Sequence, residues 1–175
     1  MKTLSGLLAI MILLSALSVS SKGQSLENGW LGILPLVSTR EDVEKKLGKP
    51  EIDNNGYHGF VHDGTFIQVN YAVGPCQPDR RGRGSLNVPK DTVLGYHVWF
   101  KQGLKLSDLK WSKDRYQKQV DSHAWNQVIY VNYKEGISIK VGLRDDGEYV
   151  ANIVFTPSET LRKKFQCPGT KASSR

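Results

Sequence analysis

No cysteine directly follows the one long apolar run of this 175-residue chain, and no second run of that length occurs. The missing cysteine excludes a bacterial-type lipid anchor on a processed N-terminal residue. A transmembrane helix needs about 20 consecutive apolar residues. Once the first run is removed, we therefore expect no transmembrane segment.

Recognisable catalytic motifs are also lacking. The segment 82–85 (Gly-Arg-Gly-Ser) has neither the strand–turn–helix setting of a nucleophile elbow nor the third glycine of a dinucleotide-binding loop. His58, His62 and Asp63 are the closest approach to a metal cluster. The two histidines would share a strand face about 13 Å apart, at about 3.3 Å per residue, which is too far for one zinc ion.

We therefore expect no metal, no cofactor and no catalytic residues. Paired carboxylates on neighbouring strands can meet without any sequence signature. A small secreted hydrolase with an unrecognised active site is thus the alternative, in which His97, His123 or two carboxylates would converge in a pocket.

Acidic residues are fewer than basic ones, 17 against 24, which gives a net charge of +7. This excess favours polyanions or anionic envelope surfaces as partners. Basic residues do not alternate with aromatic ones as they do in single-strand binders. We expect no specific nucleic-acid partner.

The N-terminal run has the three parts of a secretory signal peptide. Lys2 gives a positive start, residues 4–19 are almost all apolar, and small and polar residues follow. We expect a signal peptide at 1–21, a flexible lead-in at 22–30, one domain at 31–168 and a disordered tail at 169–175. A permanent N-terminal anchor is the alternative to cleavage.

Cysteine is scarce, since only Cys76 and Cys167 occur. In an exported protein, which folds in an oxidising compartment, two cysteines predict one disulfide. Two free thiols, one of them a nucleophile, are the alternative.

The first predicted helix follows Ser38. Ser38 and Glu41 fit a capping box, and Val43 and Leu47 lie four residues apart on one face. The helix ends at Gly48, before Pro50.

Most of the remaining chain alternates as strands do, and Ser158 begins a short C-terminal helix. We predict a long loop at residues 74–90 and an irregular helix at residues 104–124. The predicted strands are 57–62, 65–73, 93–101, 127–133, 137–143 and 149–155. The fold class is α+β, an antiparallel sheet of about five to six strands with one or two short helices packed on it. The order of elements suggests a duplicated helix-plus-three-strand unit.

Around the first helix the chain resembles the SmpA/OmlA family of outer-membrane assembly lipoproteins and, more distantly, beta-lactamase-inhibitor domains. The resemblance spans residues 33–50 and lacks the lipid-bearing cysteine of that family. It implies a small helix-on-sheet domain used for protein–protein contact in a cell envelope, without catalysis. The residues that carry it are Ile33, Thr39, Val43, Leu47, Gly48 and Pro50.

Two features suggest binding surfaces. A disulfide would bring two basic runs together as an anion-binding patch, with a solvated loop as the simpler interpretation. Trp99 lies on the opposite strand face from Tyr96 and Phe100, so it either fills a second core or presents an apolar contact. The basic residues are Arg80, Arg81, Arg83, Arg162, Lys163 and Lys164.

These patterns predict an exported, periplasmic or secreted, non-catalytic binding or accessory protein of the cell envelope. We expect its partner to be a protein or an anionic envelope component.

Overall fold

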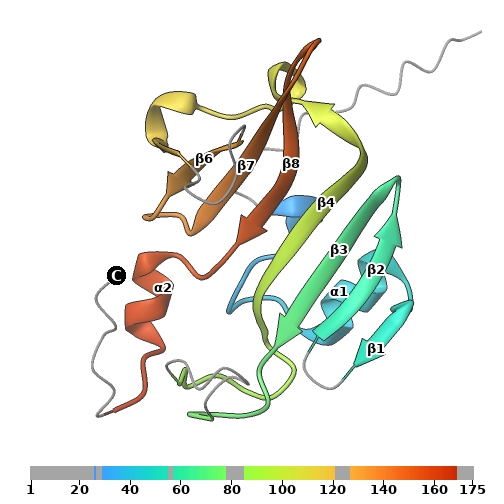
Figure 1. The fold of residues 1–175 in the computed structure, drawn as a ribbon. Helices are drawn as coiled ribbons and strands as arrows, with labels where there is room; N and C mark the ends of the chain where they lie inside the picture. The colour runs from blue at the N-terminus through green and yellow to red at the C-terminus, as the bar shows by residue number, and fades with distance from the viewer. Residues whose placement is uncertain (1–25, 27–28, 55–56, 78–84, 121–126, 169–175) are drawn as a thin grey trace, which may run out of the picture.

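Eight strands of the described residues form one antiparallel sheet in the order β1-β2-β3-β4-β8-β7-β6-β5 (Figure 1). The computed structural model describes residue 26 and residues 29–54, 57–77, 85–120 and 127–168. The strands are β1 (Ile52–Asn54), β2 (Tyr57–His62), β3 (Thr65–Tyr71), β4 (Val93–Lys105), β5 (Gln117–Val120), β6 (Gln127–Asn132), β7 (Ile137–Arg144) and β8 (Gly147–Phe155). The helices are α1 (Arg40–Leu47) and α2 (Glu159–Lys164), and the short 3-10 turns are η2 (Trp30–Gly32), η3 (Leu106–Asp108) and η4 (Lys113–Arg115).

The fold is mixed, with few helices and one antiparallel sheet, as predicted, but the predicted number of strands is wrong. The two strands that were not predicted, β1 and β5, form the outer edges of the sheet, and all their residues are exposed. A strand exposed on both faces lacks the alternation of buried and exposed residues on which strand prediction depends.

The strand order has a mirrored form. Strands β1 to β4 pair consecutively, strands β5 to β8 do the same, and β4 pairs with β8 to join the two halves. Each half is a four-stranded meander, and the last strand of each meets the other at the centre of the sheet.

The irregular helix predicted at 104–124 is wrong for the residues that the structure describes there. Strand β4 continues to Lys105, and two 3-10 turns then lead into β5. Leu106 and Leu109 are buried. These leucines attach the turns to the core individually, so they do not form one continuous helix face.

The N-cap of helix α1 lies one residue later than predicted. Thr39 is the N-cap: its side chain accepts from the Asp42 amide, and Asp42 accepts from the Thr39 amide at 2.8 Å. Ser38 instead accepts from the Leu34 amide at 3.0 Å. The predicted capping box of Ser38 and Glu41 is therefore replaced by the neighbouring pair.

The main core lies between one face of the sheet and a layer made of α1 and the segment before it, which lie behind the strands in Figure 1. The Tyr96 hydroxyl on β4 ties this layer to the sheet, since it donates to the Ile33 carbonyl and accepts from the Trp30 amide, both at 2.8 Å. Leu26, within the predicted lead-in, is 3% exposed and belongs to this core. The predicted signal peptide and tail lie outside the described residues.

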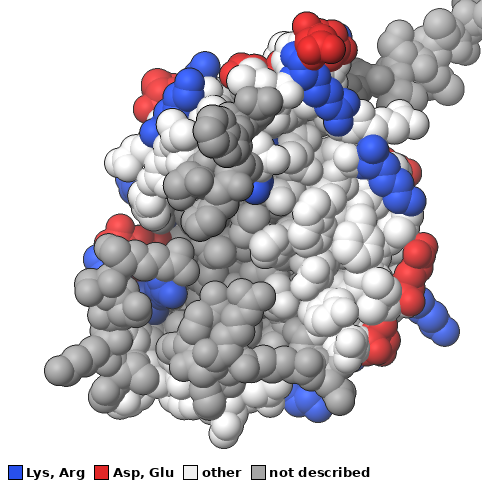
Figure 2. Space-filling view, in the orientation of Figure 1, with Lys and Arg blue, Asp and Glu red and all other residues white. Residues whose placement is uncertain are grey.

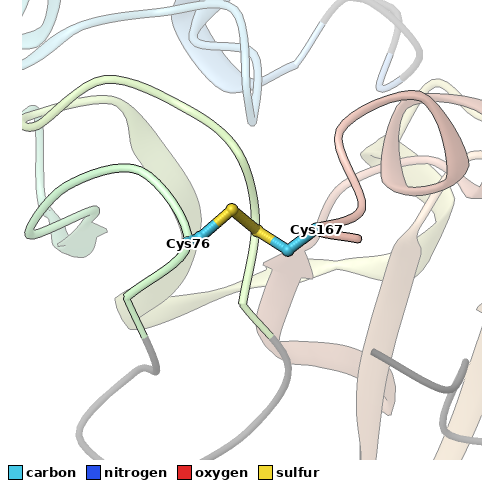
Figure 3. The surroundings of a disulfide bond; sticks show 2 residues. All are labelled: Cys76 and Cys167. Atoms are coloured by element: carbon cyan, nitrogen blue, oxygen red, sulfur yellow. A yellow bond between two sulfur atoms is a disulfide. The ribbon is translucent and has the colours of Figure 1, made fainter. Parts of the chain in front are cut away.

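A second, smaller core joins α2 to the loops below the sheet. Leu36, Ala72 and Val88 are buried there. The partly buried side chains packed against them are Leu86, Leu94, Leu161 and Phe165. The predicted disulfide is present beside this cluster and joins Cys76 to Cys167, whose Cα atoms lie 5.7 Å apart (Figure 3).

Candidate functional site

The face of the sheet opposite α1 is built from two rows of side chains that cross the strands. Residues directly opposite each other on neighbouring strands point to the same face. The first row is Val61, Phe66, Trp99, Asn152 and Lys140, and the second is Gly59, Gln68, His97, Val154 and Ser138. We call these two rows the aromatic face.

Aromatic rings are central to this face. The rings of Phe66 and Trp99 lie 5.6 Å apart at a tilt of 36°, and those of Trp99 and His97 stack at 5.1 Å with an angle of 18° between their planes. All three side chains are half-buried. Their contacts with one another restrict their rotamers, so they present a preorganised surface.

Gly59 gives the Phe66 ring its position. A Cβ atom at residue 59 would lie 2.9 Å from the Phe66 Cζ atom and 3.2 Å from the Ile52 Cβ atom. The ring therefore lies over the glycine, and a larger residue there would displace it.

The aromatic face is almost free of charge. Among the ten residues of the two rows, Lys140 is the one lysine, and none is arginine, aspartate or glutamate. Figure 2 shows the consequence: the surface over β3 and β4 is white, while blue and red side chains lie around its margin. An uncharged patch on a chain with net charge +7 is a local departure from the overall composition.

No protein-family model matches the chain, and no curated protein matches it. Among solved structures, the chain is similar to a cysteine-rich secretory protein from Staphylococcus aureus subsp. aureus Mu50, with 11% identity and a TM-score of 0.36. The match covers 82% of this chain and 51% of that one, so this chain spans about half of its length. A likeness at this level assigns neither fold nor function, and the SmpA/OmlA resemblance stays a prediction.

The structure places only half of the predicted basic patch. Arg162, Lys163 and Lys164 are exposed in the last turn of α2, close in sequence to Cys167. Lys163 pairs with Glu159 at 2.6 Å, which neutralises part of this run. Arg80, Arg81 and Arg83 lie outside the described residues. Anion binding therefore stays a prediction.

The histidines are dispersed. His58 is 5% exposed, and its Nδ1 atom lies 3.4 Å from Asp53 Oδ1, whereas His62 lies 3.4 Å from Asp63. Burial lowers the pKa of His58, and the nearby Arg40 guanidinium lowers it further. His97 belongs to the aromatic face, and His123 lies outside the described residues.

No group of three or more histidine, cysteine or carboxylate side chains that could hold a metal ion occurs among the described residues. Within the same part of the chain, no helix is long and apolar enough to cross a membrane.

The sequence predicted that Trp99 lies on the opposite strand face from Tyr96 and Phe100, with a second core or an apolar contact as the alternatives, and the strand register agrees on the face. It missed Phe66, Gln68 and Gly59. The alternation along β3 already separates Phe66 and Gln68 from the buried Ile67 and Val69. Which of these side chains meet Trp99 depends on the register between β3 and β4, which the sequence does not encode locally.

Proposed function

We propose that this chain is an exported, non-catalytic binding protein of the cell envelope that acts by protein–protein contact through the aromatic face. The single observation that carries the proposal is the cluster of Phe66, Trp99 and His97 on a nearly uncharged sheet face. The centres of protein interfaces are depleted in charge and enriched in aromatic residues, with polar groups around them. Gln68 and Asn152, which lie next to the rings on the neighbouring strands, supply such polar groups.

Export is part of the same proposal. It is supported by the signal-like pattern of residues 1–21 and by the bond between Cys76 and Cys167, since disulfides persist mainly in oxidising compartments. We place the protein in the periplasm or outside the cell. The alternative, a small secreted hydrolase, would require His97, His123 or two carboxylates to converge in a pocket. On the strands that neighbour β4, the register places Gln68 and Val154 opposite His97.

The mirrored strand order supports the proposal that the domain is a duplicated unit. Helix α1 precedes the first meander, and the turns η3 and η4 precede the second. Each unit then has four strands rather than the three that the sequence predicts.

The binding proposal is tested by expressing the tagged full-length chain in its own cells and cross-linking the intact envelope before purification. We expect a co-purified protein whose recovery falls roughly 30-fold in Trp99→Ser, because interface hot spots are worth about 2 kcal/mol or more. Leu143→Ser is the matched control, since Leu143 is 53% exposed and belongs to neither row of the aromatic face.

Equal recovery of that protein with both variants would refute contact through this face. Thermal unfolding of both variants shows whether the fold is retained. Fractionation of the same cells tests export separately: a product found in the cytosol with both thiols free would contradict it.

A further inference from the structure

A second surface differs from the aromatic face because it carries charges of both signs. An open depression of about 500 Å³ lies between the turns that follow β4 and the hairpin that joins β7 to β8. Protein pockets that bind small ligands have volumes of about 300–1,000 Å³. Figure 2 shows blue and red side chains together at the upper end of the molecule, where Figure 1 places this hairpin.

Trp111 forms an apolar wall of the depression. Its ring meets the rings of Tyr116 and Tyr130 edge to face, each at 5.0 Å between centroids. Two such contacts hold the indole in one orientation, which leaves an aromatic surface available to a ligand at a small entropic cost.

The negative groups come from the β7–β8 hairpin, where Asp146 and Glu148 line the depression. The Tyr149 hydroxyl donates a hydrogen bond to Asp146 Oδ2, and the Arg144 guanidinium lies 4.4 Å from the centroid of the Tyr149 ring. This chain of contacts fixes one carboxylate. The hydrogen bond from Tyr149 lowers the pKa of Asp146, so the carboxylate is ionised at neutral pH.

Gly103 on β4 makes this arrangement possible. Its φ of +77° favours glycine, and a Cβ atom there would lie 3.1 Å from Tyr149 Cδ1 and 3.3 Å from the Arg144 guanidinium. Because residue 103 has no side chain, β4 can lie close to the Arg144–Tyr149 pair.

The positive groups come from the other side of the depression. Lys105 ends β4, and Lys113 begins η4, with its ammonium 5.4 Å from the centroid of the Tyr130 ring. Ser107 adds a hydroxyl between them in sequence. The depression thus combines carboxylate, ammonium and aromatic groups, and its negative and positive charges come from two separate parts of the chain.

We propose that this depression binds a small zwitterion with an aromatic side chain, such as an aromatic α-amino acid. The ammonium of the ligand would pair with Asp146 and Glu148, its carboxylate with Lys105 and Lys113, and its ring would lie against Trp111. A ligand with a single charge would pair with the carboxylates or with the lysines of the depression, but not with both. The site would therefore select zwitterions over singly charged ligands.

Four probes separate the three parts of this recognition, with binding measured on the full-length protein by calorimetry. L-phenylalanine has both charges and a ring, phenethylamine lacks the carboxylate, 3-phenylpropanoate lacks the ammonium, and glycine lacks the ring. We expect L-phenylalanine to bind at least tenfold more tightly than each of the other three. Failure of L-phenylalanine to bind at millimolar concentration, or an analogue that binds as tightly as L-phenylalanine, would overturn the proposal.

Variants locate the site. Asp146→Asn and Lys113→Met keep side chains of similar shape and remove one charge each, and we expect each to weaken L-phenylalanine binding at least fivefold. Leu143→Ala, on the same hairpin but outside the lining, should leave the affinity unchanged. Unchanged affinity in both charge variants would place the amino acid elsewhere and refute this site. These measurements are independent of the aromatic face.

Discussion

The surroundings of His58 disfavour the protonated, charged form of its imidazole. Its Nδ1 atom is buried and has no hydrogen-bond partner among the residues that the structure describes, and its ring meets the Tyr71 ring edge to face at 4.9 Å. The charged groups around it are Arg40 and Glu44 of α1, Asp53 of β1 and Asp91 of the loop before β4. Burial and Arg40 outweigh the carboxylates, so the folded protein favours the neutral imidazole and the pKa of His58 is lowered.

This lowered pKa makes stability depend on pH in a defined direction. Below pH about 6.5 the unfolded chain binds a proton at residue 58 that the folded protein does not yet bind. The free energy of unfolding therefore falls as the pH decreases from about 6.5 to the lowered pKa of the folded state, by at most about 1.4 kcal/mol per pH unit.

We expect His58→Phe to reduce this pH dependence, because it keeps a ring beside Tyr71 and removes the titrating group. The measurement is urea unfolding between pH 7 and pH 5, comparing slopes rather than absolute stabilities. His62→Gln is the control, since His62 lies near the exposed Asp63 at the β2–β3 turn. An unchanged slope in His58→Phe would contradict the assignment of the proton uptake to His58.

Ser38 and Thr39 show how far residue-level prediction reaches. Both side chains can cap a helix, and each is followed three residues later by an acidic residue, Glu41 or Asp42. The choice between them depends on the preceding turn, where Ser38 accepts from the Leu34 amide and is removed from capping. The existence and end of the helix were predictable, but its first residue was not.

At the scale of elements, α2 depends on contacts that are remote in sequence. Its last turn is followed by backbone hydrogen bonds from Asn87 to Phe165 at 2.7 Å and from Cys167 to Ser85 at 3.4 Å. Leu161 and Phe165 pack against the second core. A six-residue helix is not stable alone, so these contacts and the disulfide maintain it.

We expect the double variant Cys76→Ser/Cys167→Ala to lower the free energy of unfolding by about 2–4 kcal/mol, the usual range for loss of a disulfide. Alanine avoids placing a hydroxyl at the buried position 167. Hydrogen exchange should show lost protection at the amides of Asn87 and of α2, while β3 and β7 remain protected. Retained protection in α2 would mean that the second core holds the helix without the disulfide.

Strands with one buried face were predictable, and edge strands were not. The prediction at 57–62 matches β2, and that at 137–143 matches β7 to within one residue. In β7 the buried Ile137, Ile139 and Val141 alternate with partly exposed residues, which is the pattern that strand prediction uses. The aromatic face was predictable only as far as Trp99 on its own strand, since its assembly from β3, β4 and β8 requires pairing across the sheet.

At the scale of the molecule, the contact between β4 and β8 unites the two meanders. Gly95 lies at this contact, and a Cβ atom there would be 2.8 Å from the Phe155 carbonyl oxygen. The obstacle is backbone rather than a flexible side chain, so the strands would have to separate. Tyr96 and Phe155 stack at 4.5 Å beside it and link the cores of the two halves.

We therefore expect Gly95→Ala to destabilise the whole sheet by about 1–3 kcal/mol, the cost of inserting a methyl group into a packed site. If the two halves unfold as one unit, the substitution lowers the midpoint of a single unfolding transition that both halves share. The two halves can be followed separately, because Trp99 lies on β4 and Trp111 lies between β4 and β5. Fluorescence of single-tryptophan forms that retain one or the other should report the same midpoint.

Gly142→Ala on β7 is the matched control, because a Cβ atom at that position meets no atom of the described residues within 4 Å. Its stability should stay within about 0.5 kcal/mol of the parent. Two separate midpoints in Gly95→Ala, with only one of them shifted, would show that each meander folds independently. The eight strands would then be two domains in contact rather than one cooperative sheet.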